Sequence, residues 1–314
     1  MREIGGYLQL DLYSQPMLHE GAIALNSGRN CLAYLIRKKK IKKIWIPKFL
    51  CASVADVCRR ENVDVNYYSI DLNFTPLLEA TEEWTYIVNF YGQISNDKII
   101  KYKQKYPKLI IDNVQSYYQR PIAGVDTIYT CRKFFGVTDG AFLYSDVELD
   151  KLETDESFER IHFLLGRFER SASEFYGEFV SEEEKIGEWD VKRMSKLTSN
   201  LLHGIDYERV KGKRKDNYQY LHSSLGDINK LVLIVPDGPY MYPLYIENGA
   251  EIRKALQAEN IFIPTLWPDV LKLCNEGELE YDLAKNILPL PIDQRYGIED
   301  MAFVVNEINK QRRL

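Results

Sequence analysis

Short β-prone segments alternate with amphipathic helical segments through the first 145 residues. We expect strands at 43–47, 64–70, 85–92, 108–112, 126–130 and 141–145, and helices at 29–40, 51–62 and 96–106. Parallel strands need a crossover connection, usually a helix, so this alternation is typical of a layered α/β domain with a largely parallel sheet. Ligands bind such sheets at the carboxyl ends of the strands. The residues at those ends are therefore the candidates for a functional site.

The pattern changes after residue 150. Residues 150–225 are charged, helix-prone and free of proline, with 193–221 as a long helical part. A strand and two helices are then expected, at 240–247, 250–260 and 298–311. We therefore expect a large α/β domain of residues 1–190 and a smaller α+β domain of residues 191–314, against which the N-terminal segment could also pack.

Composition excludes several classes of partner. The net charge is −5 and no extended basic face is apparent, which argues against nucleic acid; the one basic run, 37–43, is expected to be a solvated helix end. No apolar run of about 18 residues occurs, which argues against a membrane span. Five cysteines without a CxxC pair and four scattered histidines indicate a reducing compartment and no metal site. We expect a cytoplasmic protein.

Three strand ends carry residues whose chemistry stands out. Ser27 and Gly28 precede the first helix, where they could simply cap it or could let backbone N–H groups approach an anion. Asp112 ends the apolar strand 108–112, either as a turn cap or as a carboxylate aimed at a cationic ligand group. Lys133 lies between two buried strands beside Arg132 and two phenylalanines, either as a surface lysine or as an amine whose pKa is lowered.

Together these groups suit pyridoxal phosphate. The phosphate of this cofactor needs N–H donors, its pyridine nitrogen needs a carboxylate to stay protonated, and its aldehyde needs a lysine amine. A lysine near aromatic rings and a second cation would supply a neutral amine more readily than an ordinary lysine.

The sequence also resembles the DegT/StrS family of pyridoxal-phosphate-dependent sugar aminotransferases. The most specific likeness is in "IIDNVQS", which carries Asp112 and Gln115, and in "DTIYTCRKFFGVTDG", which takes the place of the family's lysine segment. Weaker likenesses follow the family order at 25–36, 44–54, 87–97 and 287–308. The resemblance implies the fold-type-I aminotransferase architecture, an α/β fold with a mainly parallel central sheet and a smaller α+β C-terminal domain.

The resemblance also implies roles for particular residues. Lys133 would hold the cofactor covalently and, once displaced, carry the proton between substrate and cofactor carbons. Asp112 would pair with the pyridine nitrogen, and Gln115 would lie near the ring hydroxyl. The phosphate would be bound by Ser27, Gly28 and Arg29, together with the Thr130 hydroxyl.

The chain departs from the family pattern at several positions. The family's hydroxyl residue stands five positions before the lysine, whereas Thr130 stands three before Lys133. Cys51 aligns with the aromatic residue that stacks on the cofactor ring, and Phe49 or Tyr91 could take that role. The Asn-Tyr-Arg segment through which a neighbouring subunit reaches the active site is absent. The chain thus resembles a short, divergent member whose substrate need not be a nucleotide sugar.

The activity that the resemblance implies is amino-group transfer. The donor would be glutamate or glutamine and the acceptor a keto-sugar or related carbonyl compound, in surface-polysaccharide or secondary-metabolite biosynthesis. The family also implies a homodimer with active sites at the subunit interface. Because arginine binds carboxylates in a bidentate manner, the donor carboxylate could meet Arg29, Arg132 or Arg295, and Tyr91 could line the substrate site.

Other functions compete with this one. The family's sugar dehydratases carry histidine in place of the lysine, so Lys133 argues against that activity. A catalytically inactive relative that binds a sugar or cofactor for regulation stays open. A nicotinamide-binding Rossmann protein is disfavoured because no GxGxxG follows the early strands. Tyr117 and Tyr118 could line a sugar site or pack in the core.

Overall fold

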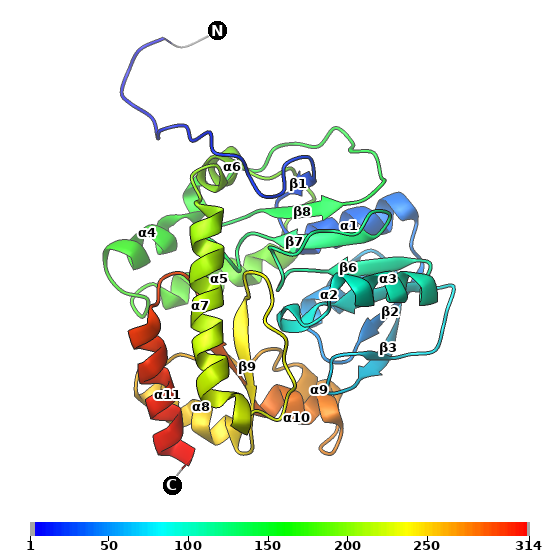
Figure 1. The fold of residues 1–314 in the computed structure, drawn as a ribbon. Coiled ribbons are helices and arrows are strands. Elements are labelled where there is room, and N and C mark those ends of the chain that lie inside the picture. Colours follow the sequence, from blue (N-terminus) through cyan, green and yellow to red (C-terminus); the bar gives the residue numbers. More distant parts are fainter. Residues whose placement is uncertain (1–3, 313–314) are drawn as a thin grey trace.

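The computed structural model describes residues 4–312. Its centre is an eight-stranded sheet with the order β1-β8-β7-β6-β5-β2-β3-β4 (Figure 1). The strands are β1 (Ile23–Leu25), β2 (Lys43–Pro47), β3 (Asp64–Ile70), β4 (Pro76–Leu77), β5 (Trp84–Val88), β6 (Leu109–Asp112), β7 (Asp126–Thr130) and β8 (Ala141–Tyr144). β8 is antiparallel to β1 and β7, and β4 is antiparallel to β3, whereas the other neighbours are parallel. The predicted mainly parallel sheet is confirmed.

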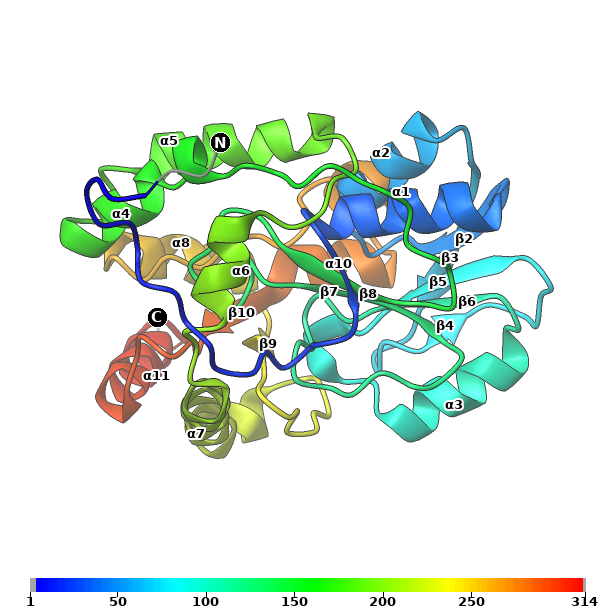
Figure 2. The ribbon, with the colours of Figure 1, turned by 90° about the horizontal axis from the view of Figure 1, so that it is seen from above.

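Helices cover both faces of this sheet. They are α1 (Gly28–Lys39), α2 (Ala52–Arg60) and α3 (Asn96–Lys105). α1 and α2 lie on one face and α3 on the other (Figure 2). Strand alternation explains the division: Val88 and Ile110 are buried in the core that α1 and α2 share, whereas Ile87 and Ile111 pack with Ile99 of α3.

The segment after β8 is helical but interrupted. Its helices are α4 (His162–Glu169), α5 (Tyr176–Lys185), α6 (Lys196–Leu202) and α7 (Tyr207–Leu225), with short 3₁₀ turns at Phe158–Arg160, Ile186–Glu188 and Gly226–Ile228. The expected long helical part at 193–221 is divided between two helices, and each has its own N-cap. Ser195 accepts a hydrogen bond from Thr198 N at the start of α6, and Asp206 accepts one from Arg209 N at the start of α7.

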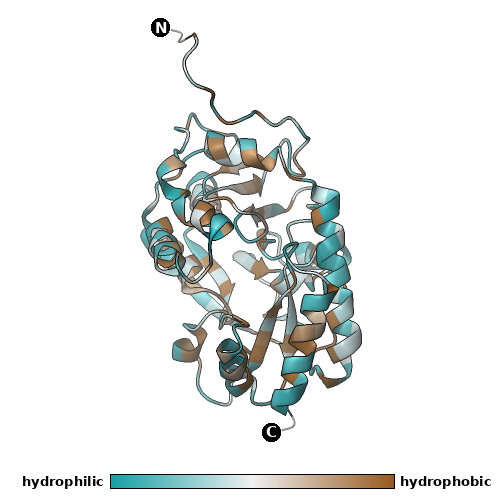
Figure 3. Cartoon of the chain, turned by 90° about the vertical axis from the view of Figure 1, so that its left-hand side faces the viewer, coloured by the Kyte–Doolittle hydropathy of each residue, from teal (hydrophilic) through white to brown (hydrophobic). Residues whose placement is uncertain are grey.

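The last part of the chain combines a two-stranded antiparallel sheet with helices. Its elements are β9 (Met241–Tyr245), α8 (Gly249–Ala258), α9 (Val270–Leu273), α10 (Leu279–Asn286), β10 (Ile287–Pro291) and α11 (Ile298–Arg312). The sequence does not predict β10, because Pro289 and Pro291 lack the N–H that a strand ladder needs; a two-stranded sheet has only edges, where proline is accommodated. The strands are mostly hydrophobic, and hydrophilic residues run along the outer helices (Figure 3). The division at residue 190 stays a prediction.

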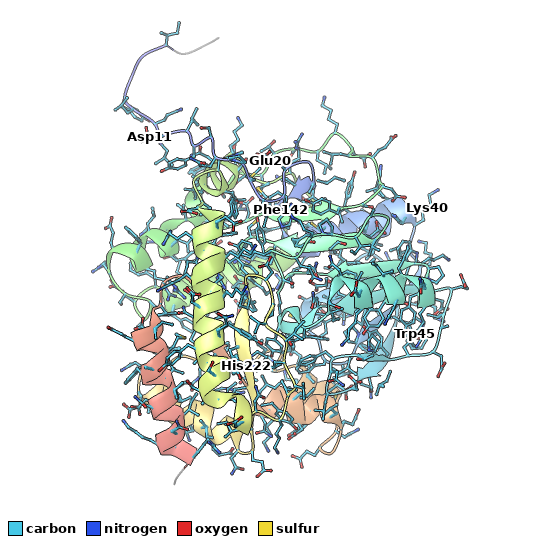
Figure 4. All side chains as sticks on the ribbon, in the orientation of Figure 1. Asp11, Glu20, Lys40, Trp45, Phe142 and His222 are labelled. Atoms are coloured by element: carbon cyan, nitrogen blue, oxygen red, sulfur yellow. The ribbon has the colours of Figure 1, made fainter. Side chains whose placement is uncertain are left out.

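The basic run at 37–43 closes α1. Lys38 pairs with Asp150 at 2.8 Å and Lys39 with Asp126 at 3.0 Å, while Lys40 adopts a left-handed φ of 51° as the C-cap. Lys40 lies at the edge of the molecule (Figure 4). The run is therefore the end of a helix rather than a separate binding face. Within residues 4–312, no helix has both the length and the apolar character needed to cross a membrane.

An N-terminal arm, residues 4–12, extends away from the body of the molecule (Figure 1). Its apolar side chains are exposed, namely Ile4, Tyr7, Leu8, Leu10 and Leu12. The base of the arm is fixed beside α6, where Tyr13 N donates to Asn200 Oδ1 and Gln15 N donates to His203 O, each at 3.0 Å. The arm therefore has a fixed base and an unpartnered apolar end.

Candidate active site

The strand-end residues singled out in the sequence meet at one edge of the central sheet. β6 ends at Asp112 and its parallel neighbour β7 leads into the loop 131–140, which carries Lys133. The N-terminus of α1 begins beside both strand ends. A Cβ atom built on Gly28 would lie 3.7 Å from Val114 Cγ1 and 3.8 Å from Ile128 Cγ2.

The Lys133 loop is fixed at its start by backbone bonds and aromatic packing. The amides of Phe134 and Phe135 donate to Cys131 O at 3.0 and 2.9 Å, and both rings are buried. Phe134 O accepts from Arg214 Nη2 at 3.3 Å and from Gln294 Nε2 at 2.8 Å. The buried Arg214 guanidinium also lies 4.7 Å from the centroid of the Phe134 ring. The C-terminal part of the chain thus holds the residue next to Lys133.

The end of the loop is held by a buried carboxylate. Asp139 is fully buried and accepts from Ser195 N at 2.8 Å, from Ser195 Oγ at 2.7 Å and from Thr198 Oγ1. The loop turns at Gly140, whose φ is 108°, and a Cβ there would lie 2.9 Å from Thr198 Cγ2. Glycine is therefore required at 140 both by conformation and by space. The loop cannot move without breaking its contact with α6.

Lys133 is accessible to water, yet protein surrounds its amine closely. This desolvation lowers the pKa of Lys133, and the neighbouring Arg132 cation acts in the same direction, while the Asp112 carboxylate opposes both. The exposed Lys133 side chain can be reached by a ligand. Such an amine is available for condensation with a carbonyl compound.

Asp112 is a buried carboxylate that accepts two hydrogen bonds. Tyr86 Oη donates to Asp112 Oδ2 at 2.6 Å and Val114 N donates to Oδ1 at 2.9 Å. Burial raises the pKa of Asp112, and the Tyr86 hydroxyl, the Lys133 cation and the Val114 amide lower it. Each carboxylate oxygen has one further lone pair, so Asp112 can accept from a protonated ligand nitrogen.

Gln115 orients the chain after β5. Gln115 Oε1 accepts from Tyr91 N at 2.7 Å, and Tyr91 has a left-handed φ of 53°. No hydrogen bond within residues 4–312 engages Gln115 Nε2, which leaves a donor for a ligand hydroxyl. The expected strand at 85–92 accordingly ends at Val88, because the chain turns at Tyr91.

The first turn of α1 offers two N–H donors. Ser27 Oγ accepts from Asn30 N at 3.1 Å, so Ser27 caps the helix. The amides of Gly28 and Arg29 have no acceptor among the described residues, as expected at a helix start. The cap and the anion cradle are thus compatible, because capping uses the Ser27 side chain and leaves these amides free. Thr130 Oγ1 lies 3.5 Å from Gly140 O and is almost fully buried.

The two aromatic residues proposed to stack on the cofactor ring, Phe49 and Tyr91, lie in the core. Phe49 is 1% exposed, and its ring centroid lies 5.3 Å from that of Phe90 and 4.8 Å from that of Trp267. Tyr91 is also fully buried. Both rings pack against other side chains of the core, and stacking by Phe49 or Tyr91 stays a prediction. Cys51 is the residue that lies near Lys133, at the N-cap of α2.

The three arginines proposed for a carboxylate already have partners. Arg132 Nη2 pairs with Glu183 Oε1 on α5, and Arg29 Nη1 donates to Glu183 O at 3.5 Å. Arg295 Nε pairs with Asp293 Oδ1 at 2.6 Å. Arg132 is the one adjacent to Lys133. Tyr117 and Tyr118 are buried among aromatic rings, which supports the packing alternative for both.

Sequence reasoning missed Tyr86 and Glu183. In β5, Tyr86 pairs with Ile110, so it lies diagonally opposite Asp112 on the same face of the sheet. A tyrosine two residues before the end of a strand next to β6 is a signal that could have identified it. Glu183 stands in a run of three glutamates on a charged helix, and nothing in the sequence distinguishes it from its neighbours.

Comparisons with known proteins agree with this geometry. No protein-family model matches the chain, and no curated protein matches it in sequence. Solved aminotransferase structures share its fold. DesV of S. venezuelae, in complex with a ketimine intermediate, has a TM-score of 0.64 and 15% identity over 92% of this chain and 84% of its own.

Two further structures give the same result. A DegT DnrJ EryC1 StrS aminotransferase from Brucella abortus has a TM-score of 0.62 and 16% identity, covering 93% of this chain and 86% of its own. NtdA from Bacillus subtilis, with bound cofactor PMP, has a TM-score of 0.66 and 12% identity, covering 92% and 72%. At such identities the comparison establishes the fold, which is the predicted fold type I of pyridoxal-phosphate-dependent aminotransferases.

Proposed function

We propose that this protein is a pyridoxal-phosphate-dependent aminotransferase. The observation that carries the proposal is the pairing of two groups at one sheet edge: the Lys133 amine, whose pKa is lowered by its surroundings, and the buried Asp112 carboxylate. A fold shared with solved aminotransferases supports it.

The residues present suit each part of the cofactor. The amides of Gly28 and Arg29, at the start of the twelve-residue α1, would hold the phosphate with the help of the helix dipole. Asp112 would face the pyridine nitrogen and Gln115 Nε2 the ring hydroxyl. Lys133 would form the covalent attachment. The half-buried Cys51 would lie where the family's aromatic residue stacks on the ring.

The chain's own groups then divide the work of the reaction. When bound, the cofactor supplies an electron sink that makes the donor's α-hydrogen acidic. The freed Lys133 amine would take that proton and return it, as a general base and then a general acid. Asp112 would hold positive charge on the pyridine nitrogen, and Tyr86, by donating to Asp112, would keep that carboxylate ionised and oriented.

We infer that the donor is an amino acid such as glutamate or glutamine and that the acceptor is a keto-sugar or related carbonyl compound. The sugar aminotransferases among the structural neighbours support this class of acceptor. Surface-polysaccharide or secondary-metabolite biosynthesis is the proposed context. A reducing cytoplasm is the proposed location, since all five cysteines are unpaired.

A direct test follows the amino group. The protein, incubated with pyridoxal phosphate and glutamate or glutamine, should release the corresponding 2-oxo acid once per cofactor, and a keto-sugar acceptor should make release continuous. Lys133→Ala should abolish release, whereas replacement of the exposed Lys101 on α3 by alanine (Lys101→Ala) should not change it. If the unaltered protein binds the cofactor but releases no 2-oxo acid with any donor, the inactive, ligand-binding relative is the better account.

We further propose a homodimer in which the N-terminal arm docks on a second copy. Five exposed apolar side chains would bury roughly 100 Å² each, so two exchanged arms would cover roughly 1,000 Å². A standard stable interface buries about 1,600 Å² in total. In an extended chain Leu8, Leu10 and Leu12 share one face, and Gln9 and Asp11 lie on the other.

Light scattering tests this assembly. The unaltered chain should be dimeric. The triple variant Leu8→Ser, Leu10→Ser and Leu12→Ser should dissociate at least about tenfold more readily, whereas Gln9→Ser with Asp11→Ser should not. A monomeric parent chain, or a triple variant as tightly dimeric as the parent, would contradict the proposal.

A further inference from the structure

Arg132, next to Lys133, can bind a carboxylate through two donors, of which only one has a partner. Its Nη2 pairs with Glu183 Oε1, but its Nε is buried and has no partner among the described residues. Nε and Nη2 form the edge of the guanidinium that a carboxylate can grip with both oxygens. Glu183 therefore satisfies one of the two donors on that edge and leaves the other unpaired. Leaving a buried donor without a hydrogen bond costs free energy. A ligand carboxylate that accepted from both Nε and Nη2 would remove that cost.

Glu183 is carried by a weakly anchored pair of helices. We call residues 162–185, which comprise α4 and α5, the flap. α5 has no buried residue, and Phe163 is the only buried residue in α4. The two helices pack on each other at Gly166, where a Cβ would lie 2.3 Å from the Phe175 ring. A segment with few buried apolar contacts opens at low free-energy cost.

The chain is anchored just after the C-terminal end of the flap, so the flap can pivot about that point. Arg60 Nη1 donates to Gly187 O at 2.8 Å, and Ile186 is buried. In the view from above, α5 lies next to α2, on the same side as α1 (Figure 2). The ion pair between Glu183 and Arg132 joins the flap to the Lys133 loop. Arg29 also binds the flap, by donating to the backbone oxygen of Glu183.

Space exists beside this ion pair. A cavity of about 460 Å³ is lined on one side by Arg29, Asp56 and Arg60 and on the other by Phe179 and Glu183. The Glu183 side chain, which is about a third exposed, lies at the wall of this cavity. It can thus swing away from Arg132 toward the cationic Arg29 and Arg60 without crossing the core.

We propose that Glu183 is an internal competitor for the amino donor's carboxylate, which must displace Glu183 from Arg132 and thereby release the flap. The inference rests on the proposed aminotransferase function, because that function supplies a carboxylate ligand next to Lys133. Glu183 then sets specificity: it raises the donor concentration needed for occupancy and excludes ligands that lack a carboxylate able to take both Nε and Nη2 of Arg132. A carboxylate neutralises the charge on Arg132 in both states, and the donor's carboxylate would also pair with Nε.

Glutarate is a suitable probe, because it has the carboxylates of glutamate but no amine to react. Its dissociation constant would be measured calorimetrically for the parent chain, Glu183→Gln and Glu184→Gln, with pyridoxal phosphate bound and, in parallel, without it. Glu184 is an exposed neighbour on the same helix and forms no ion pair among the described residues. Glu183→Gln should bind glutarate about tenfold more tightly, and Glu184→Gln should match the parent within about twofold.

A double variant identifies the partner. Arg132→Gln should weaken glutarate binding, and adding Glu183→Gln to it should give no gain, because the competition is for Arg132. Equal affinity of Glu183→Gln and the parent, or a gain that persists without Arg132, would overturn the proposal. If Glu183→Gln does not fold, hydrogen exchange of the parent decides instead: glutarate should speed exchange in residues 176–185, and unchanged or slower exchange there would overturn the proposal.

Failure of the competition by Glu183 can be distinguished from failure of the proposed aminotransferase function. Formation of the cofactor's visible absorption band in the parent and in Glu183→Gln tests the function, since neither outcome depends on Glu183. A band in both with no change in glutarate affinity would overturn only the competition by Glu183. No band in either would overturn the function, while the titration without cofactor would still decide whether Glu183 competes for Arg132.

Discussion

Tyr86→Phe should destabilise the folded chain by an amount that grows with pH. Tyr86 Oη donates to Asp112 Oδ2 at 2.6 Å, and both residues are buried. A hydrogen bond to an ionised group contributes about 1.5–3 kcal/mol, whereas a bond between neutral groups contributes about 0.5–1.5 kcal/mol. Removing the hydroxyl should therefore cost the larger amount when Asp112 is ionised and the smaller amount when it is protonated.

The sign of the pH dependence follows from the pKa of Asp112. Burial raises this pKa in the folded chain, so the folded chain holds its proton to higher pH than the unfolded chain does. The stability that the carboxyl contributes is complete below its ordinary pKa and is lost as pH rises through the folded value. The Tyr86 hydroxyl lowers the pKa of Asp112, so its removal raises that pKa further and extends the loss to higher pH.

Urea denaturation at the lowest pH at which the chain stays folded and at about pH 8 measures this difference. Tyr68→Phe is the matched control, because Tyr68 Oη is also buried but donates at 2.7 Å to a neutral acceptor, Tyr86 O. Tyr86→Phe should lose about 1.5–3 kcal/mol at the higher pH and less at the lower, and Tyr68→Phe should lose about 0.5–1.5 kcal/mol at both. Equal losses for Tyr86→Phe at the two pH values, or a loss at pH 8 no larger than that of Tyr68→Phe, would refute the reasoning.

Two pairs of substitutions test the roles of Gly28 and Asp139. Gly28→Ala should leave the free energy of unfolding within about 0.5 kcal/mol, because the added Cβ meets only ordinary contacts, yet it should weaken pyridoxal phosphate binding at least about tenfold by crowding the phosphate. Gly249→Ala, whose Cβ would lie 2.1 Å from a backbone oxygen, should instead lower stability by about 1–3 kcal/mol. Asp139→Asn should cost about 1.5–3 kcal/mol and loosen the Lys133 loop, whereas Asp146→Asn, at an exposed position, should cost less than about 0.5 kcal/mol; denaturation and cofactor titration check all four.

The strands and helices of the central sheet could be predicted because they depend on the spacing of apolar residues close together in the sequence. The strands expected at 43–47 and 64–70 coincide with β2 and β3, and the helix expected at 29–40 is α1 within one residue. Residues at strand ends also came together as predicted, since parallel neighbours end at the same sheet edge. Asp112 and Lys133 are adjacent for that reason.

The features that the sequence did not predict depend mostly on contacts between distant parts of the chain. Phe49 is enclosed by Trp267, more than two hundred positions away, so its burial cannot be inferred from neighbouring residues. Glu183 meets Arg132 only because the flap folds back along α2. The start of α7 depends on the cap at Asp206, whose polar side chain also suits the interior of a charged surface helix.

Covalent attachment of the cofactor tests the central claim most directly. The protein would be incubated with pyridoxal phosphate, its visible absorption recorded, and the product reduced with borohydride and mapped by peptide mass spectrometry. The account predicts a yellow band that reduction fixes to the peptide containing Lys133, and no such label in Lys133→Ala. The absence of a band, or a label spread over surface lysines with Lys133 unmodified, would contradict it.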